Sequence, residues 1–319
     1  NLTLQTSVKA SYSNQRTVFE GGSFRNPMLS RFFLLPIDPV KEDGEYWWNP
    51  NTHRMSNSLF NTAFIQEHDY TKTKTTKIFG TGRVEWRPVE GLKLTSKIGL
   101  DYFNIEEPRY WNPVHGDGFS YQGYATSYFT RNFNWVWQNM ADYGFNFAQD
   151  HRLEFKLVYE AQKNKNYDIS TTAERVATMG LENLSSFASP VEASSSAMNW
   201  TSSSAMFNVH YGFNQRIFLD ATYRREGNSR FSSENKYGNF WSVGASWNLS
   251  QESFLGAPTW LSNLSLKASY GVNGNAGIGN FLYLSRFGYG ASYDDYPVMY
   301  YTGIRNQDLT WEVNKPLNL

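Results

Sequence analysis

Apolar and polar side chains alternate over long stretches of this chain, most clearly between residues 217 and 249 (IFLDATYRREGNSRFSSENKYGNFWSVGASWNL). Two arms each carry apolar residues at every second position: Ile217, Leu219, Ala221 and Tyr223 in the first, and Trp241, Val243, Ala245, Trp247 and Leu249 in the second. Because successive side chains of a β-strand point to opposite faces, each arm has one apolar face and one face of polar or small residues. The polar connection between the arms is longer than a tight turn requires. This combination predicts a hairpin that crosses a membrane, with lipid against the apolar face and water against the other.

The same alternation recurs along the whole chain. It predicts about nine complete strands and the start of a tenth, at residues 2–14, 78–86, 92–104, 133–147, 153–160, 205–213, 217–224, 241–249, 264–272 and from 309 onward. Short turns alternate with long polar segments, which we expect to be loops at about 15–73, 105–130, 164–200 and 273–307. The third of these loops contains a weakly helical stretch, TTAERVATMGLENL. Since the connections alternate in length, all long loops lie at one end of the strands and all short turns at the other.

Aromatic residues mark both ends of the predicted apolar faces. Strands that run toward the long loops end in tyrosine, at Tyr12, Tyr102, Tyr159, Tyr223 and Tyr270. Strands that run toward the short turns end in large rings, at Trp86, Phe147, Phe213 and Trp247. Two aromatic rows at opposite ends of an apolar band are typical of an outer-membrane barrel, whose rings lie at the level of the lipid headgroups.

A soluble β-sandwich or jelly roll also alternates apolar and polar positions and is the main alternative. In a sandwich the apolar faces form a core, and the rings are scattered along the strands. Soluble strands are usually about 5 to 6 residues long, whereas the arms read here run about 9 to 15, near or above the roughly 9 to 11 that cross a membrane at a tilt. The pattern therefore favours an all-β, antiparallel transmembrane barrel.

Composition narrows the class of protein further. The 319 residues carry 29 basic and 29 acidic side chains, so no bulk field favours nucleic acid as a partner. No stretch approaches the roughly 18 to 20 apolar residues that a transmembrane helix needs. The absence of cysteine excludes disulfides and thiolate metal sites and suits an exported envelope protein. No signal peptide precedes the first strand, so we expect the chain to be either processed or an excerpt of a longer protein, and we favour the excerpt.

Several segments together resemble the SusC/RagA-type TonB-dependent transporters. The stretch RREGNSRFSSENKYGNFWSVGASWNLSQESFL is similar to the family's R-x-D-G-S-S-R-F … G-x-F-x-S-x-x-x-x-W-x-x-S-x-E-x-F pattern, with Glu226 where the family usually has Asp. LKASYGVNGN at 266–275 and NQDLTWE at 306–312 also fit, and RNP at 25–27 fits less specifically. The order and spacing of these pieces are family-like through most of the chain.

The resemblance implies a fold and a function. It implies that residues 1–319 are part of the barrel domain of a longer receptor, about 9 to 10 strands of a 22-stranded barrel with long extracellular loops and short periplasmic turns. The plug, the TonB box and the C-terminal strands are then absent from this chain. The implied activity is TonB-dependent import of oligosaccharides or short peptides across the bacterial outer membrane, with a SusD-like surface lipoprotein as partner and outer-membrane lipid around the barrel.

Candidate ligand-binding residues are rings in the predicted long loops: Trp47, Trp48, Tyr110 and Trp111. Exposed rings there are suited to stacking on a sugar face, to packing against the lipoprotein, or to forming small cores within the loops. We leave these three roles open.

Other chemistry is poorly supported by the sequence. The five histidines (His53, His68, His115, His151 and His210) show no metal-ligand spacing, and no catalytic Ser/His/Asp set is discernible, so we expect no metal, no cofactor and no enzymatic activity. Two alternative functions remain, an outer-membrane barrel hydrolase and a soluble carbohydrate-binding β-sandwich. The hydrolase requires a complete, smaller barrel with histidines and carboxylates at one rim, and the sandwich requires a second sheet over the apolar faces.

Overall fold

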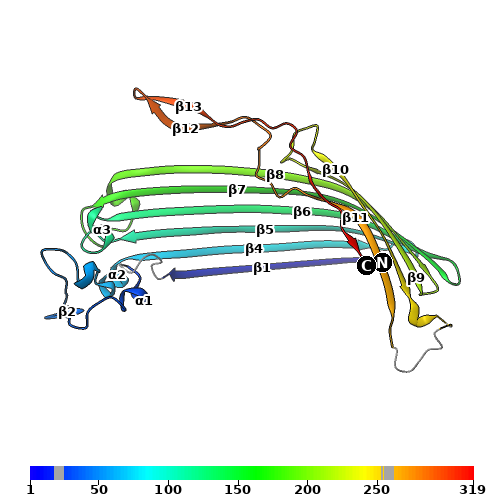
Figure 1. Cartoon of the computed structure of the whole chain (residues 1–319), viewed down its shortest axis with the longest axis horizontal. Coiled ribbons are helices and arrows are strands. Elements are labelled where there is room, and N and C mark those ends of the chain that lie inside the picture. Colours follow the sequence, from blue (N-terminus) through cyan, green and yellow to red (C-terminus); the bar gives the residue numbers. More distant parts are fainter. Residues whose placement is uncertain (18–24, 253, 255–261) are drawn as a thin grey trace.

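A single antiparallel sheet dominates the structure, a computed structural model that describes residues 1–17, 25–252, 254 and 262–319 (Figure 1). Each strand pairs with its neighbours along the chain. The nine long strands are β1 (Leu2–Thr17), β4 (Tyr70–Trp86), β5 (Leu92–Trp111), β6 (Tyr124–Ala148), β7 (His151–Val176), β8 (Phe187–Phe213), β9 (Ile217–Asn228), β10 (Tyr237–Asn248) and β11 (Ser265–Asn275). Two short strands, β14 (Glu312–Asn314) and β15 (Leu317–Asn318), pair with β11, so the predicted nine strands and the start of a tenth are confirmed.

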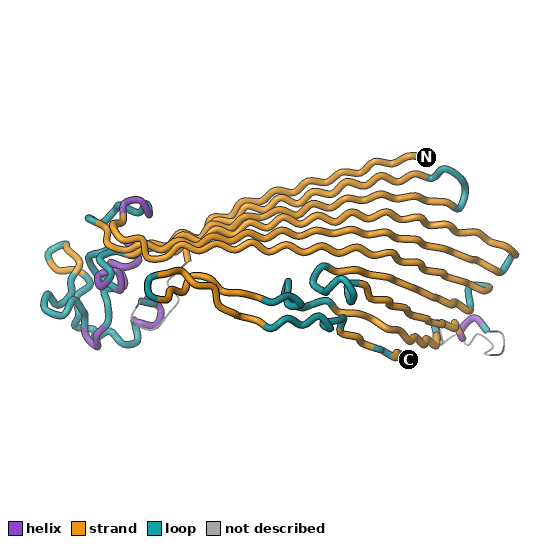
Figure 2. The backbone as a smooth tube through the Cα atoms, turned by 90° about the horizontal axis from the view of Figure 1, so that it is seen from above, coloured by secondary structure: helices purple, strands orange, loops and turns teal. Residues whose placement is uncertain are grey.

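Short elements occupy the connections. The first long loop holds α1 (Pro27–Ser30), β2 (Lys41–Glu42), β3 (Glu45–Tyr46), η1 (Ser56–Ser58) and α2 (Thr62–His68), and later connections hold α3 (Asp117–Ser120), η2 (Leu184–Ser186), η3 (Leu249–Gln251), β12 (Arg286–Tyr293) and β13 (Tyr296–Gly303). The helices α1, α2 and α3 gather at one end of the long strands (Figures 1 and 2). In the part of the chain that is described, no helix is long and apolar enough to cross a membrane.

The connections alternate in length as predicted. The turns from β4 to β5, from β6 to β7 and from β8 to β9 contain only a few residues, and they lie at the end opposite to α1, α2 and α3 (Figure 1). The connection from β10 to β11 belongs to the same end, but residues 253 and 255–261 within it lie outside the described residues. Because consecutive strands are antiparallel neighbours, this alternation places all long loops at one end of the strands.

The strand register confirms the predicted faces. Leu219 pairs with Tyr211 on β8 and with Ala245 on β10, so apolar residues are neighbours across the sheet. A register slip of one residue would have turned every side chain to the other face. Ile98 and Trp137 are likewise partners on β5 and β6. The apolar residues therefore form one continuous band, which we call the outer face; the alternate, mostly polar positions form the inner face.

In the described part of the chain, no second sheet covers the outer face. Within the described residues the only other sheets are two-stranded, and the long strands form one curved layer (Figures 1 and 2). Leu4 and Leu219 remain 70 % and 46 % exposed. The sandwich alternative is therefore wrong, because it requires these rows to be shut away from their surroundings.

The aromatic rows cross the sheet obliquely. Tyr102 pairs with Phe133 on β6, whereas Tyr159 pairs with Asn139, six positions nearer to the short turns (133 to 139). The row of large rings at the other end steps in the same direction from β4 to β6. Strands of a barrel are tilted against its axis, so a level ring of residues shifts steadily in register from strand to strand. The stepping agrees with a tilted barrel wall.

Strand lengths differ from the prediction. β6, β7 and β8 contain 25, 26 and 27 residues. β5 and β6 extend into both ends of the predicted loop at 105–130, and β7 and β8 extend through much of the predicted loop at 164–200. The predicted helical stretch is wrong, since its first part up to Val176 belongs to β7. About 9 to 11 residues suffice to cross the hydrocarbon. In a membrane barrel, strand residues outside the hydrocarbon meet water on both faces of the sheet. The apolar–polar alternation therefore fades from the sequence there, although backbone pairing continues.

Candidate functional site

The inner face carries ion pairs within and between the strands. The Asp142 carboxylate lies between Lys93 Nζ and Lys156 Nζ, at 3.4 and 3.3 Å. Arg224 Nη2 lies 3.6 Å from Glu160 and 3.0 Å from Glu226. These side chains remain partly exposed to the space inside the curve of the sheet, so the wall presents charges of both signs to water.

Above the charged positions, five amides lie in a row on the inner faces of β6 and β7 and form two hydrogen-bonded groups, which we together call the amide ladder: Asn132, Asn164 and Asn166 in one, and Asn134 and Gln162 in the other. Gln162 Nε2 donates to Asn134 Oδ1 at 3.1 Å, and Asn164 Nδ2 donates to Asn132 Oδ1 at 3.1 Å. Asn132 Nδ2 in turn reaches Asn166 Oδ1 at 3.3 Å. Because amides both donate and accept, a row of them stays hydrogen-bonded internally and still offers atoms to a ligand.

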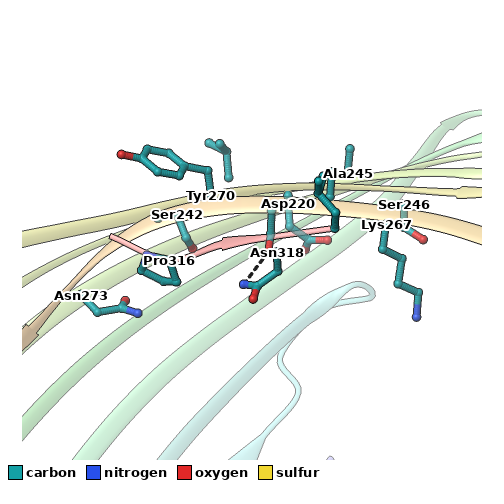
Figure 3. Close-up of a pocket in the computed structure, with 15 residues that line it drawn as sticks. Asp220, Ser242, Ala245, Ser246, Lys267, Tyr270, Asn273, Pro316 and Asn318 are labelled. Atoms are coloured by element: carbon teal, nitrogen blue, oxygen red, sulfur yellow. Dashed lines mark hydrogen bonds between the residues drawn. The ribbon is translucent and has the colours of Figure 1, made fainter. Parts of the chain in front are cut away.

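Both faces are visible at the C-terminal side of the sheet, where a hollow is lined by residues of β9, β10, β11 and β15 (Figure 3). Lys267 and Asn318 lie on one side of the ribbon, and Tyr270 lies on the other. Lys267 and Tyr270 differ by an odd number of positions, so their opposite directions follow from the strand period. The side chains thus point to opposite faces of the sheet, as the alternation in the sequence predicts.

The loops above the wall are tied together by a buried polar group, which we call the loop hub: Asn61, Asp69, Asn112 and His115. Asn61 caps α2 at its N-terminus by accepting from Phe64 N, and its own backbone N–H donates to His115 Nε2 at 2.8 Å. Asn112 donates from its backbone N and from Nδ2 to Asp69 Oδ1, at 2.7 and 2.5 Å. The hub therefore joins the first long loop to the connection between β5 and β6.

Burial shifts the pKa values of two groups in the hub. Loss of water raises the pKa of Asp69 to about 7, although hydrogen bonds from Asn112 and the charge of Arg25 act in the opposite direction. Loss of water, with smaller effects of Arg54 and His53, lowers the pKa of His115 to about 4. Both shifts favour the neutral form, as expected where charge leaves water.

The predicted ring pair in the first long loop is divided between two environments. Trp48 stacks on the His115 ring at 4.1 Å and meets Phe64 edge-on at 5.2 Å, so it packs on the loop hub. Trp47 is partly exposed, and its backbone is held by Val40 O and by the side chain of Asn61. Trp48 thus packs on the hub with its ring, whereas Trp47 is tied to the hub through its backbone.

The other predicted ring pair ends β5 instead of lying in a loop. Tyr110 is 1 % exposed and packs with Val176 and Phe187, while its hydroxyl accepts from Gly180 N at 3.3 Å. Trp111 lies between the Tyr124 ring at 4.4 Å and the Arg25 guanidinium at 4.1 Å. Both rings thus have packing contacts within the protein.

A cluster that the sequence did not identify as a unit joins the segments carrying the family resemblance. Phe231, Phe240 and Trp311 form a buried core, with ring centroids 4.9 Å apart for Phe231–Trp311 and 5.2 Å for Phe240–Trp311. We call it the motif cluster. Ser232 and Asn235 both donate to Gln307 O at 3.0 Å. The aromatic residues within two of the motif segments, Phe231 and Phe240 in the first and Trp311 in NQDLTWE, were the available signal.

Glycines allow the motif cluster to close. A Cβ atom at Gly274 would lie 2.0 Å from the Phe240 ring, and one at Gly238 would lie 2.4 Å from it. Arg230 lies beside the motif cluster. Its guanidinium is 4.7 Å from the Trp200 ring, and its Nε donates to Asn280 Oδ1 at 2.9 Å. The motif residues are therefore explained by packing of the loop after β11 against the β9–β10 hairpin.

The described residues show no group of three or more His, Asp, Glu or Cys side chains that could hold a metal ion. The closest approach of a histidine to a carboxylate on the inner face is His210 Nδ1 to Asp220 Oδ1, at 2.8 Å. A single pair of this kind is a common polar contact on a wet surface.

Comparisons with known proteins agree with this architecture. No family model matches the chain. TonB-dependent receptor P39 of Formosa agariphila is 25 % identical over 98 % of this chain and 29 % of its own length. TonB-dependent receptor SusC of Bacteroides thetaiotaomicron is 34 % identical over 33 % of this chain and 11 % of its own. The chain spans less than a third of the length of the curated relatives it matches.

Solved structures show the same fold. The RagAB peptide transporter superposes with a TM-score of 0.82 at 20 % identity, covering 98 % of this chain and 36 % of that one. The RagAB peptide importer in its 'open-open' state gives the same TM-score over 99 % of this chain. The predicted all-β, antiparallel barrel wall is confirmed by this likeness.

Proposed function

We infer that this chain, a part of the barrel of a SusC/RagA-type TonB-dependent receptor, belongs to a transporter that imports oligosaccharides or short peptides across the bacterial outer membrane. The observation that carries the proposal is the one-layer wall with an apolar outer face and a charged and amide-rich inner face. In hydrocarbon every backbone group needs a partner within the protein, and a paired wall of tilted strands supplies it.

In this proposal, residues 1–319 are a middle portion of a 22-stranded barrel. The plug and the TonB box belong to other parts of the longer protein. TonB pulls on the plug, and cargo passes along the inner face. The relatives have receptor and transporter names, which supports import over the alternative of a barrel hydrolase.

The long loops face the cell exterior and meet a SusD-like surface lipoprotein, which captures cargo and closes over the barrel. The structure offers the loops as a connected unit, because the loop hub joins the first long loop to the β5–β6 connection. Co-purification of the full-length transporter with a lipoprotein encoded beside it tests this partnership. Recovery of the transporter alone at every detergent condition contradicts it.

Uptake in cells tests the transport function. Cells producing the full-length transporter should accumulate labelled oligosaccharide or peptide only when TonB is present, because the plug otherwise keeps the barrel closed. Equal uptake in cells without TonB contradicts energy-coupled import. Uptake of no cargo of either kind contradicts the proposed cargo classes.

Trp47 is the predicted ring that we propose to contact cargo. Trp47→Ala should weaken cargo binding to the intact transporter–lipoprotein complex by roughly 1 kcal/mol or more, as truncation of a contacting tryptophan does at interfaces. Tyr124→Phe is the matched control, since it retains the ring beneath Trp111. Unchanged affinity of Trp47→Ala assigns its ring to packing.

A further inference from the structure

A hollow of about 270 Å³ lies on the inner face where β4, β5 and β6 run side by side. Its upper edge is one row of paired residues, Phe79, Asp101 and Asn134. Its lower edge contains Lys97 and its partner Gln138. The hollow lies beside the amide ladder, with which it shares Asn134.

Glycine forms the floor of this hollow. Gly99 stands between the two edges, at an inner-face position where the other rows carry Asp101 and Lys97. A Cβ atom at Gly99 would meet nothing nearer than Val136 O, at 4.0 Å. A side chain would therefore fit at position 99, and its absence leaves room on the wall.

Residues of β7 hold the amides at the rim. Asn134 Oδ1 accepts from Gln162, which directs the Asn134 amino group away from β7. Gln138 Nε2 donates to Glu160 Oε2 at 2.6 Å, which leaves Gln138 Oε1 as an acceptor. Within the described part of the chain, neither Asn134 Nδ2 nor the Asp101 carboxylate has a hydrogen-bond partner. The rim therefore offers oriented donors and acceptors before a ligand arrives.

We propose that this hollow binds one sugar residue of a neutral oligosaccharide. A sugar ring has hydroxyl groups that both donate and accept, and it has C–H faces that pack on an aromatic ring such as Phe79. Lys97 and Asp101 carry opposite charges, so their fields offset and give an anionic sugar no advantage. The volume is below the roughly 300 to 1,000 Å³ of pockets for drug-sized ligands, which fits a single residue of a longer chain.

A peptide is the less suitable occupant. One common mode of peptide binding adds a strand to a free sheet edge, and that mode is closed here, because β4, β5 and β6 are paired on both sides at this level. The hollow also lacks an enclosed apolar space for a large side chain. The proposal rests on the import function inferred above and selects the oligosaccharide from its two cargo classes.

Gly99→Val in the full-length transporter, purified with its lipoprotein if one co-purifies, tests the site. The probes are a pool of neutral hexose oligosaccharides, a matching pool containing uronic acids, and a hexapeptide library. We expect the neutral pool to bind, and Gly99→Val to weaken that binding at least about tenfold by occupying the floor. Gly80→Val is the matched control: it also lies in open space, but on the outer face of β4.

Asn134→Leu gives a second variant that leaves the glycine floor intact. It removes the oriented amino group and should also weaken binding of the neutral pool about tenfold. Wild-type affinity in both Gly99→Val and Asn134→Leu overturns the proposal, as does a wild-type transporter that binds only the peptides or only the acidic pool. TonB-dependent uptake of any cargo, measured in parallel, keeps the transport function standing even when the sugar site fails.

Discussion

The outer and inner faces of the wall are made from alternate residues of the same strands, yet they meet opposite surroundings. On β9, Leu219 belongs to the apolar band, and its neighbour Asp220 accepts a contact from His210 on the inner face. In the proposed barrel, apolar residues on the outer face need no internal partner, because lipid solvates them. Polar residues on the inner face pair with one another across strands and remain wet. The difference shows that in a wall of one layer, the solvent on each side takes the place of a protein core.

The strongest test of this comparison exchanges a charge between the faces. Leu219→Arg should lower the free energy of unfolding by about 2 to 4 kcal/mol, since a cation at mid-bilayer depth loses its hydration. Phe218→Arg, one residue away on the inner face, should cost clearly less. Reversible unfolding of the full-length protein in lipid vesicles measures both. Equal costs, or the reverse order, contradict the assignment of faces.

A smaller effect on stability is expected in the motif cluster, where a glycine lies against a buried ring. Gly274→Ala should lower the free energy of unfolding by roughly 1 to 3 kcal/mol, because its new Cβ atom would overlap the buried Phe240 ring. Gly80→Ala on the outer face has no neighbour within 4 Å and should change stability by less than about 0.5 kcal/mol. Denaturant titration of both variants in the same vesicles checks the contrast. Similar values for the two would show that the motif cluster yields easily.

The loop hub provides polar groups that are dry, in contrast to the wet inner face. Because the pKa of Asp69 is raised to about 7, its protonated form is favoured in the folded hub, and the stability this gives is lost as the pH rises from about 4 through 7. The lowered pKa of His115 acts oppositely: its contribution is present above about 6.5 and is lost as the pH falls through about 4. Between pH 6.5 and 7 only Asp69 should matter.

Asp69→Asn separates these two contributions. The variant keeps an oxygen that can accept from Asn112, but its side chain cannot ionise. Only the contribution of His115 then remains, so the hub of the variant should become more stable as the pH rises to about 6.5 and then stay constant. The ratio of protease cleavage rates in residues 41–68, wild type over variant at each pH, measures the difference. A ratio that does not change between pH 5 and 8 contradicts a buried, raised carboxyl at Asp69.

The smallest effect is expected from the exposed charges of the inner face. Arg224→Gln removes contacts with Glu160 and Glu226, but these side chains are partly solvated, so the free energy of unfolding should fall by about 0 to 1 kcal/mol. The change should shrink further at high salt. A loss comparable to that of Leu219→Arg would mean that the inner face is drier than its exposure indicates. Denaturant titration at two salt concentrations gives the answer.

The sequence and the structure agree on the wall and differ above it. The alternation around Leu219 predicted both the strand and its face, because a one-residue slip would expose the wrong side chains to lipid. The predicted helix at TTAERVATMGLENL failed because local propensity there is weak, and pairing with β6 and β8 supplies more hydrogen bonds than an isolated helical turn. Tyr110 was expected in a loop because alternation fades from the sequence before β5 ends at Trp111.

By itself, the sequence determined the strands, their order, their faces and the ends that carry the long loops. Each of these follows from short-range alternation and from connection length. Only the tertiary structure decided that Trp48 stacks on His115, that Phe231 and Trp311 share one cluster, and that Gly99 forms the floor of a hollow. These contacts join residues tens of positions apart, and no local pattern specifies them, because they depend on which strands become neighbours and on how far the paired wall extends beyond the membrane.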